Sequence, residues 1–304
     1  MPAFLLISLS VGICGCTSVL QRTGIALFYK NANLPESQVR REVVYREGST
    51  LPKHRLDLFL PAPTKTNWPV LIFIHGGGWT EGDKSLHAGG ADVYGNIGRF
   101  YAAHNIGVAV INYRLQPGAN WREQIDDAAC TTAWIHSHIA EFGGDARRLF
   151  VSGHSAGAQL AARIALDSAP LKKYGLSPAI FSGVISVSGA GLDLADEKTY
   201  ELGASRKYYS DRFDNTNDWK KIASPVNFAK AGAPPFLILY AGGEKKPLQR
   251  QSQRLSEVLS QQGISNQVVV VPGQSHARMV LTLSRPDKIS APAVLEFIEN
   301  QIKK

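Results

Sequence analysis

The feature of this chain that most restricts its fold is a series of six short apolar runs separated by longer amphipathic segments. The apolar runs cover residues 70–75, 107–113, 149–151, 184–187, 236–240 and 268–271. Runs of this kind are typical of strands buried on both faces of a sheet. Amphipathic segments long enough for crossover helices cover residues 97–104, 124–141, 156–166, 248–262 and 289–302. The alternation predicts an α/β fold, with a mostly parallel central sheet and helices on both faces.

The segment before the first apolar run follows a different pattern. Residues 41–46 and 54–60 alternate apolar and polar side chains, with Pro52 between the two stretches. Alternation is typical of strands with one face in solvent, and proline is tolerated at sheet edges and in turns. We therefore expect an antiparallel hairpin at one edge of the sheet. Because no internal repeat or low-complexity tract divides the chain, we expect residues 39–304 to form one catalytic domain.

The start of the chain is interpreted as a leader over residues 1–16 and a polar connector over residues 17–38. Residues 4–13 are apolar but too few to span a bilayer comfortably, and Gly15 and Cys16 follow them. This arrangement resembles the signal of bacterial lipoproteins, in which a small residue precedes a cysteine that is lipidated on its sulfur. The resemblance implies lipidation of Cys16 and an exported protein anchored in the bacterial cell envelope. A plain leader, cleaved or uncleaved, an N-terminal core helix and a cytoplasmic location are the alternatives.

The composition limits the partners of the chain. Its net charge is +8, but lysines and arginines are scattered, and their longest clusters are pairs such as Lys172-Lys173. Scattered charge favours a generally cationic surface over a nucleic-acid groove. No group of cysteines and histidines has the spacing of metal ligands, and the glycine-rich turn lacks the Lys-Ser/Thr of a phosphate loop. We therefore expect no metal, no cofactor and no nucleic acid, and the sequence leaves the oligomeric state open.

Ser155 is the candidate nucleophile. It is the centre of a Gly-His-Ser-Ala-Gly motif that lies between the apolar run at 149–151 and the helix expected at 156–166. A serine hydroxyl needs a base to remove its proton, and a tight strand-to-helix turn exposes it to base and substrate. Gly153 and Gly157 permit close backbone approaches that a side chain would block. The context therefore predicts a nucleophile elbow.

A second motif, His-Gly-Gly-Gly-Trp at residues 75–79, directly follows the apolar run at 70–75. Glycines at a strand end leave backbone N–H groups free to stabilise the negative oxygen that develops during acyl transfer. We expect the N–H groups of Gly77 and Gly78, together with that of Ala156 after the nucleophile, to form an oxyanion hole. A glycine-rich turn without any such role is the alternative.

His276 is the candidate general base. It lies in the loop after the last apolar run, where an imidazole can approach the serine of a neighbouring strand end. The other seven histidines all precede Ser155 in the chain. Hydrolases with a nucleophile elbow use the chain order serine, acid, histidine, so His276 is the histidine that fits.

The acid that orients the base should follow the apolar run at 236–240. Glu244 is the carboxylate in that loop, whose sequence is Ala-Gly-Gly-Glu-Lys-Lys-Pro. Asp193, one strand earlier, is the alternative, and a salt bridge with Lys245 or Lys246 is the alternative role for Glu244. We favour Glu244, because the helix that follows it returns the chain to the strand leading to His276.

The sequence pattern does not assign residues 192–218 to helices or strands. They are polar, carry several aromatic side chains and show no clean period, in a part of the chain where a loop or small cap could cover an active site. An ordinary surface excursion is an equal alternative.

Taken together, these motifs resemble the α/β-hydrolase superfamily, and most of all its carboxylesterases and kynurenine-formamidase-like enzymes with an HGGxW motif. The resemblance covers nearly all of the chain after residue 41 and includes Arg250 and Gln251, six and seven residues after Glu244. It implies the α/β-hydrolase fold, a catalytic triad of Ser155, Glu244 and His276, and oxyanion donors at Gly77 and Gly78.

The sequence therefore predicts a serine hydrolase that cleaves small-molecule carboxylic esters through an acyl-enzyme intermediate. An arylformamidase or amidase of the same fold is the first alternative. A non-catalytic binding module built on a hydrolase scaffold is the second, although such modules typically lack the nucleophile or the base. The sequence does not indicate the acyl or alcohol group of the substrate.

Overall fold

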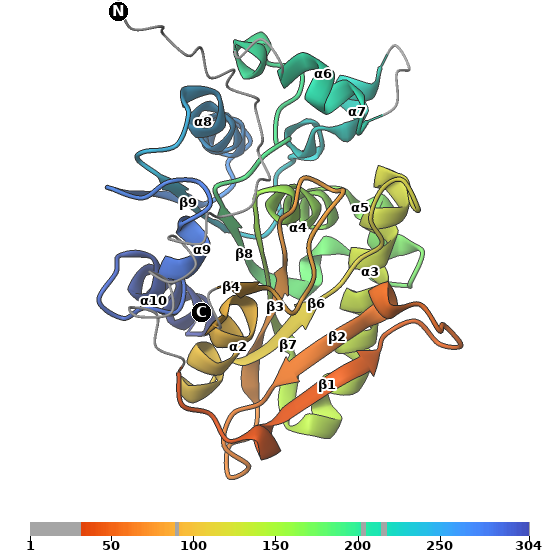
Figure 1. Cartoon of the computed structure of the whole chain (residues 1–304), viewed down its shortest axis with the longest axis vertical. Helices are drawn as coiled ribbons and strands as arrows, with labels where there is room; N and C mark the ends of the chain where they lie inside the picture. The colour runs from red at the N-terminus through yellow and green to blue at the C-terminus, as the bar shows by residue number, and fades with distance from the viewer. Residues whose placement is uncertain (1–31, 89–90, 202–204, 214–217, 304) are drawn as a thin grey trace, which may run out of the picture.

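A mixed eight-stranded sheet forms the centre of the computed structural model, which describes residues 32–303 apart from 89–90, 202–204 and 214–217. The strand order is β1-β2-β6-β3-β7-β8-β9-β10 (Figure 1). The strands are β1 (Val39–Val44), β2 (Arg55–Phe59), β3 (Trp68–Ile74), β6 (Gly107–Ile111), β7 (Gly144–His154), β8 (Phe181–Val187), β9 (Phe236–Ala241) and β10 (Asn266–Val271). The predicted leader, with Cys16, and most of the connector lie outside the described residues.

Strand direction follows the prediction. The six strands in the order β6-β3-β7-β8-β9-β10 are parallel to one another, whereas β1 and β2 form an antiparallel hairpin and β2 runs antiparallel to β6. The hairpin lies at one edge of the sheet, which confirms the interpretation of its alternating pattern. The parallel arrangement brings the carboxyl ends of β3, β7, β8, β9 and β10 to the same edge of the sheet, where the motifs are found.

Helices cover both faces of the sheet. Helices α2 (Val93–Ala103), α9 (Met279–Thr282) and α10 (Ser290–Ile302) pack on one face. Helices α3 (Trp121–His138), α4 (Ala156–Leu166) and α8 (Lys246–Gln261) pack on the other. Within the described residues, no helix has both the length and the apolar character required to cross a membrane.

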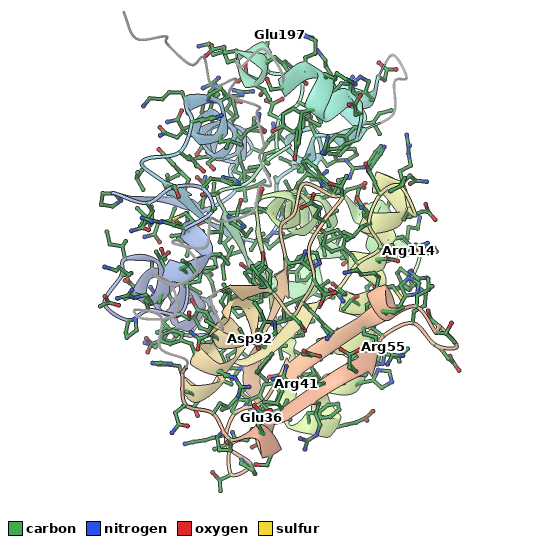
Figure 2. The ribbon with its side chains drawn as sticks, in the orientation of Figure 1. Glu36, Arg41, Arg55, Asp92, Arg114 and Glu197 are labelled. Atoms are coloured by element: carbon green, nitrogen blue, oxygen red, sulfur yellow. The ribbon has the colours of Figure 1, made fainter. Side chains whose placement is uncertain are left out.

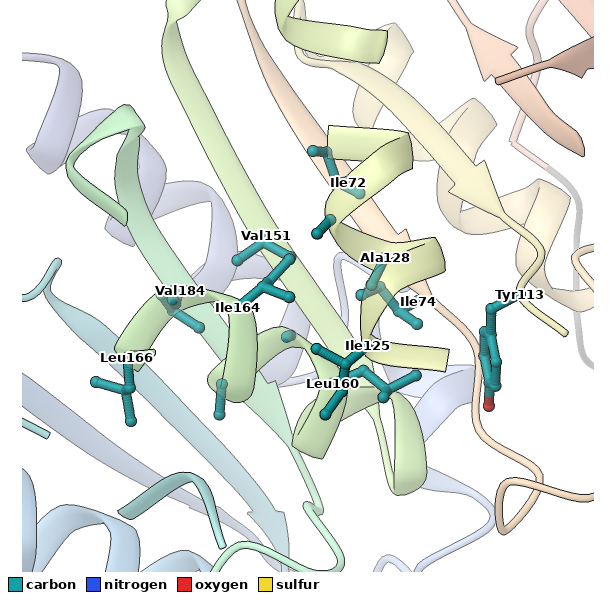
Figure 3. Packing of buried hydrophobic residues seen from close by; sticks show 14 of the residues in the cluster. Ile72, Ile74, Tyr113, Ile125, Ala128, Val151, Leu160, Ile164, Leu166 and Val184 are labelled. Atoms are coloured by element: carbon teal, nitrogen blue, oxygen red, sulfur yellow. The ribbon is translucent and has the colours of Figure 1, made fainter. Parts of the chain in front are cut away.

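Successive side chains of a strand point to opposite faces of the sheet. Because helices cover both faces, side chains at successive positions of a central strand are buried in two different cores. In β3, Ile72 and Ile74 belong to the core beneath α3 and α4, whereas Leu71 and Phe73 belong to the core beneath α2 and α10. Figure 3 shows the first of these cores, in which Leu160 of α4 and residues of α3 pack against the strands. The apolar runs therefore have the double-sided burial that their composition predicts.

The prediction is wrong for the last run. Val268 and Val270 of β10 are 39% and 45% exposed. β10 is the terminal strand of the sheet, so it has a neighbour, β9, on one side and no partner strand among the described residues on the other. An apolar run does not reveal whether its strand lies at the centre or at the edge of a sheet, and here the edge position leaves valines in solvent.

The described residues of the range 192–223, which we call the cap segment, lie over the carboxyl ends of the strands (Figure 1). It contains a short turn of helix at Glu197–Tyr200 and two short helices, α6 (Ser205–Ser210) and α7 (Trp219–Ala223). Tyr209, Phe213 and Trp219 are buried in it. The ring of Phe213 packs edge-on against that of Trp79, with centroids 4.8 Å apart. This segment is therefore packed against the glycine-rich turn, which favours the alternative of a loop or small cap over the site.

Long-range contacts with α8 hold the cap segment. The amide of Gln251 accepts a hydrogen bond from the N–H of Asp193 and donates one to the carbonyl of the same residue. Arg250 and Arg254 donate to the carboxylates of Asp196 and Asp193 at 2.7 and 3.0 Å. At the outer end of the cap segment, Glu197, labelled in Figure 2, accepts from Arg206 and Lys220. The Arg-Gln pair noted in the sequence thus connects the cap segment to α8.

Candidate active site

Ser155 lies in a tight turn between the end of β7 and the start of α4. Its backbone has φ 54° and ψ −117°, a conformation that non-glycine residues rarely adopt. Hydrogen bonds hold this conformation: the N–H of Ser155 donates to the carbonyl of Val187 at 3.0 Å, and its own carbonyl accepts from the N–H of Ala158 at 3.1 Å. The sequence therefore forms the elbow predicted for it, with the serine strained and its neighbours fixed.

Gly153 and Gly157 of the motif are required because there is no room for a side chain at either position. A methyl group built at Gly153 would lie 2.2 Å from the carbonyl carbon of Gly157. One built at Gly157 would lie 2.2 Å from the carbonyl oxygen of Ile74, at the end of β3. Both distances are far below ordinary van der Waals contact, and the obstacles are backbone atoms that cannot rotate away. The start of α4 can pack against β3 only when both positions are glycine.

His276 lies within hydrogen-bonding distance of the nucleophile. Its Nε2 is 2.9 Å from Oγ of Ser155. The histidine belongs to the loop between β10 and α9, on the strand-end side of the sheet that the parallel topology shares with the elbow. With Nδ1 protonated, Nε2 accepts the hydrogen bond of the serine hydroxyl, which is the geometry that general-base catalysis requires.

Glu244 is the carboxylate that the structure brings to His276. Its Oε2 accepts from Nδ1 of the imidazole at 2.8 Å, and its side chain is completely buried. Gln249 of α8 donates to the backbone carbonyls of Gly242 and Glu244 and thereby fixes the loop. Asp193 lies elsewhere: its carboxylate accepts from Arg254 and from the N–H of Ala195. Of the two acids predicted, the structure pairs Glu244 with the base and uses Asp193 to hold the cap segment.

The glycine-rich turn adopts a conformation that suits glycine alone. Gly77 and Gly78 have φ of 121° and 57°, and a methyl group at Gly77 would lie 1.9 Å from the carbonyl oxygen of Glu81. Their N–H groups donate to no partner among the described residues. The N–H of Ala156 starts α4, where a helix supplies no acceptor of its own. The three predicted oxyanion donors are therefore available for an external oxygen.

His75 stiffens this turn. Its Nδ1–H donates to the carbonyl of Gly76 at 2.6 Å, and its ring stacks on that of Tyr113 with centroids 4.5 Å apart. The hydroxyl of Tyr113 in turn donates to the backbone carbonyl of His75. Burial lowers the pKa of His75 to about 4. A neutral, enclosed imidazole of this kind holds the backbone in place and does not reach the nucleophile.

His154, the residue before the nucleophile, contacts the base. Its Nε2–H donates to the backbone carbonyl of His276 at 3.0 Å, and the two rings lie 5.1 Å apart. Burial, together with the nearby His276, lowers the pKa of His154 to about 3. The sequence analysis placed this histidine in the elbow but missed its contact with the base loop. No sequence pattern near either residue indicates this contact, because the two residues are 122 positions apart.

A pocket of about 450 Å³ opens beside the nucleophile. Ser155, His154 and His276 line it, together with Tyr208 and Arg212 of the cap segment. The remaining lining residues come from the glycine-rich turn and from the chain around it: Gly76, Gly77, Gly78, Thr80, Glu81, Gly82, Leu86, Tyr94, Ala277 and Val280. Tyr208 and Arg212 were missed by the sequence analysis, since only the fold brings the cap segment to the elbow.

Metal-binding geometry is not found in the described part of the chain, where no three side chains of histidine, cysteine, aspartate or glutamate are placed to hold an ion. Cys130 is a free, buried thiol in α3. The reactive groups that the structure places together at this site are the serine, the histidine and the carboxylate, with the backbone N–H groups beside them.

Comparison with known proteins agrees with this geometry. Residues 56–259 match the BD-FAE family. The chain is 26% identical over 258 residues to a probable isoprenylcysteine alpha-carbonyl methylesterase of Arabidopsis thaliana, covering 80% of this chain and 52% of that protein. It is 30% identical over 241 residues to esterase LipQ of Mycobacterium tuberculosis, covering 76% and 55%. The chain thus spans about half the length of these curated relatives.

A solved structure gives the same fold. An inhibited esterase B of Lactobacillus rhamnosis superposes with a TM-score of 0.77 at 22% identity, over 93% of each chain. With the mostly parallel sheet, the antiparallel edge hairpin and the helices on both faces, this likeness shows the α/β-hydrolase fold that the sequence predicted.

Proposed function

The chain belongs to the BD-FAE family, and on this basis we propose that it is a serine hydrolase that cleaves carboxylic esters through an acyl-enzyme intermediate. The observation that carries the proposal is the hydrogen-bonded line from Glu244 through His276 to Ser155, with distances of 2.8 and 2.9 Å. Serine, histidine and a buried carboxylate in this order are the parts that acyl transfer requires. Further support comes from relatives and structural neighbours that carry the name esterase.

In the proposed reaction, Oγ of Ser155 attacks the ester carbonyl while Nε2 of His276 takes the hydroxyl proton. The carbonyl oxygen becomes negative and accepts hydrogen bonds from the N–H groups of Gly77, Gly78 and Ala156. His276 then returns the proton to the leaving alcohol, and the bond between carbonyl carbon and alkoxy oxygen breaks. Water, activated by the same imidazole, releases the acid from the serine. Glu244 stabilises the imidazolium and fixes its tautomer throughout.

Hydrolysis of p-nitrophenyl acetate tests this proposal. Ser155→Ala and His276→Ala are each expected to lower kcat by about 10⁴- to 10⁶-fold, because nucleophile and base act as one unit. Ser182→Ala is the matched control, since its hydroxyl only donates to the carbonyl of Arg147 and lies at the opposite end of the sheet. Activity that survives in Ser155→Ala would contradict the proposal.

A panel that contains N-formylkynurenine and simple acyl esters separates the two candidate bond types. We expect turnover of the esters to exceed that of the formamide, because relatives by sequence carry the names of esterases. A kcat/KM for the formamide above that of every ester would assign the site to an arylformamidase instead.

We further propose that residues 1–16 direct the chain to the bacterial cell envelope and that Cys16 is lipidated. The sequence Ile-Cys-Gly-Cys after an apolar run supports this proposal, and it rests on sequence alone. Metabolic labelling with palmitate in a bacterial host is expected to label the full chain and not Cys16→Ala. Cys14→Ala is the matched control and should keep the label. Labelling that persists in Cys16→Ala would overturn the proposal.

A further inference from the structure

Arg212 is a fixed cation in the lining of the catalytic pocket. Its Nε–H donates to the carbonyl of Gly78 at 2.9 Å, and its Nη1–H donates to the carbonyl of Tyr208 at 2.8 Å. The guanidinium also stacks on the ring of Tyr208, 3.7 Å from the centroid. The backbone carbonyl of Arg212 is itself held by the side chain of Gln116. These four contacts keep this arginine in one place beside the oxyanion turn.

The charge of Arg212 is not neutralised within the described part of the chain. Both acceptors of its hydrogen bonds are neutral carbonyls, and the two N–H groups of its Nη2 meet no acceptor among the described residues. The neighbouring carboxylate of Asp211 pairs with Lys207 instead, at 2.8 Å. The guanidinium therefore places its positive charge in the lining of the pocket, without a counter-charge among the described residues.

Glu81 is the acidic side chain among the described residues that line the same pocket. It forms no ion pair with Arg212, and it is exposed, so that water screens its charge. Arg212 is half-buried and held against the ring of Tyr208, which leaves its charge less screened. For an anion in the pocket, the Coulomb attraction to Arg212 would therefore be stronger than the repulsion by Glu81.

We propose that this pocket selects esters that carry a second, anionic group, and that Arg212 binds this group. The anionic group that we propose is a carboxylate. A guanidinium presents parallel N–H groups that match the two oxygens of a carboxylate. Arg212 contacts the carbonyl of Gly78, the residue whose N–H is one of the groups proposed to hold the ester carbonyl. The inference rests on the proposed ester hydrolysis at Ser155 and adds the class of substrate.

The test compares charged and neutral esters of the same shape. Monomethyl esters of succinic, glutaric and adipic acids carry the anion in the acyl part, and the methyl esters of the corresponding monoamides are their neutral matches. Acetate esters of 3-hydroxypropanoate and 4-hydroxybutanoate, with their amides, carry it in the alcohol part. The measured quantity is the ratio of kcat/KM for the anionic ester to kcat/KM for its amide. This ratio cancels any effect of a variant on the oxyanion turn, because both substrates use it.

For the wild type we expect a ratio on the order of 10 to 100 for at least one pair, the range of a hydrogen bond to a charged group. Arg212→Gln should bring the ratio to about one or below, whereas Arg212→Lys should keep part of the preference. Glu81→Gln should raise the ratio. Lys207→Gln is the matched control, because it removes a neighbouring charge that is already paired and should leave the ratio unchanged.

A wild-type ratio of one or less for every pair, with the neutral esters still hydrolysed, would overturn this inference and leave the ester hydrolase standing. A preference that Arg212→Gln retains would overturn it too. Failure of the wild type to hydrolyse any ester in the panel would instead count against the proposed function itself.

Discussion

The elbow and the cap segment both line one pocket, but they are built in different ways. The elbow is made from consecutive residues, and its geometry follows from a buried strand, two glycines and the first turn of α4. The cap segment is held by partners far away in the chain, such as Gln251, which is 58 residues from Asp193. The elbow supplies the reactive group in the proposed reaction, whereas the cap segment supplies the side chains that select the substrate. Damage to the first should abolish turnover of every ester, and damage to the second should change which ester is preferred.

The largest expected difference between the two regions is in the loss of kcat when Glu244 or Asp193 is replaced. Glu244→Gln should lower kcat on the order of 10³- to 10⁴-fold, because an amide can no longer stabilise the imidazolium or fix its tautomer. Asp193→Asn should lower kcat by less than about tenfold, since its carboxylate contacts Arg254 and backbone N–H groups of the cap segment. Steady-state kinetics with p-nitrophenyl acetate measure both. If Asp193→Asn silences the enzyme and Glu244→Gln stays active, the assignment of the acid is wrong.

A second prediction concerns the glycines of the elbow. Gly157→Ala should destabilise the fold by about 3 kcal/mol, because the new methyl group overlaps the carbonyl of Ile74 at the end of β3. The matched control is Gly118→Ala, where the nearest atom, a carbonyl oxygen of Leu115, lies 3.4 Å away. Urea unfolding followed by circular dichroism compares the two variants. Equal stability of Gly157→Ala and the wild type would show that the elbow is looser than the structure describes.

Acid should weaken the elbow through its buried histidine. The folded-state pKa of His154, about 3, lies below the ordinary value of 6.5, so the unfolded chain binds more protons as the pH falls through 6.5. Stability contributed by the neutral ring is complete above pH 6.5 and is lost as the pH falls toward 3. Between pH 6.5 and 5 the loss amounts to about 2 kcal/mol. His154→Gln keeps a donor for the carbonyl of His276 and should lose correspondingly less stability on acidification.

Urea unfolding at pH 7.5 and pH 5.0 measures this difference. His87→Gln, at an exposed histidine that contacts the carbonyl of Ser85, serves as the control and should behave like the wild type. The explanation fails if His154→Gln and the wild type lose the same stability between the two pH values.

The smallest expected effect on the kinetics comes from breaking the ion pairs of the cap segment. Arg254→Met removes the ion pair with the buried Asp193 and should raise KM about three- to tenfold while kcat changes less than twofold. Arg206→Met breaks an exposed pair with Glu197 and should change either parameter by less than twofold, since exposed ion pairs contribute little. A loss of kcat in Arg254→Met as large as that in Glu244→Gln would mean that the cap segment takes part in the chemistry.

The same contrast explains how far the sequence could be interpreted. The strands, the hairpin and the strand-helix context of Ser155 were predictable, because period and composition encode them within a few residues. The line from Ser155 to Glu244 was predictable for a second reason, since parallel strands bring their carboxyl ends to one edge. The exposure of Val268 and Val270 was not predictable, because a local pattern does not state a strand's place in the sheet.

The cap segment was the least predictable part. Its aromatic side chains have no periodicity, and their neighbours come from the glycine-rich turn more than 100 positions earlier, as the contact of Phe213 with Trp79 shows. Its ion pairs with α8 likewise join carboxylates and arginines that the sequence alone cannot match. The residues expected to select the substrate therefore emerge only from the folded chain.

The central claim is that Ser155 is a nucleophile activated by His276, and reaction with a fluorophosphonate tests it most directly. Intact-mass measurement of the labelled protein should show one adduct per chain, and peptide mapping should locate it on Ser155. Ser155→Ala should show no adduct, and His276→Ala should react far more slowly than the wild type. An unlabelled wild type, or an adduct that persists in Ser155→Ala, would contradict the account.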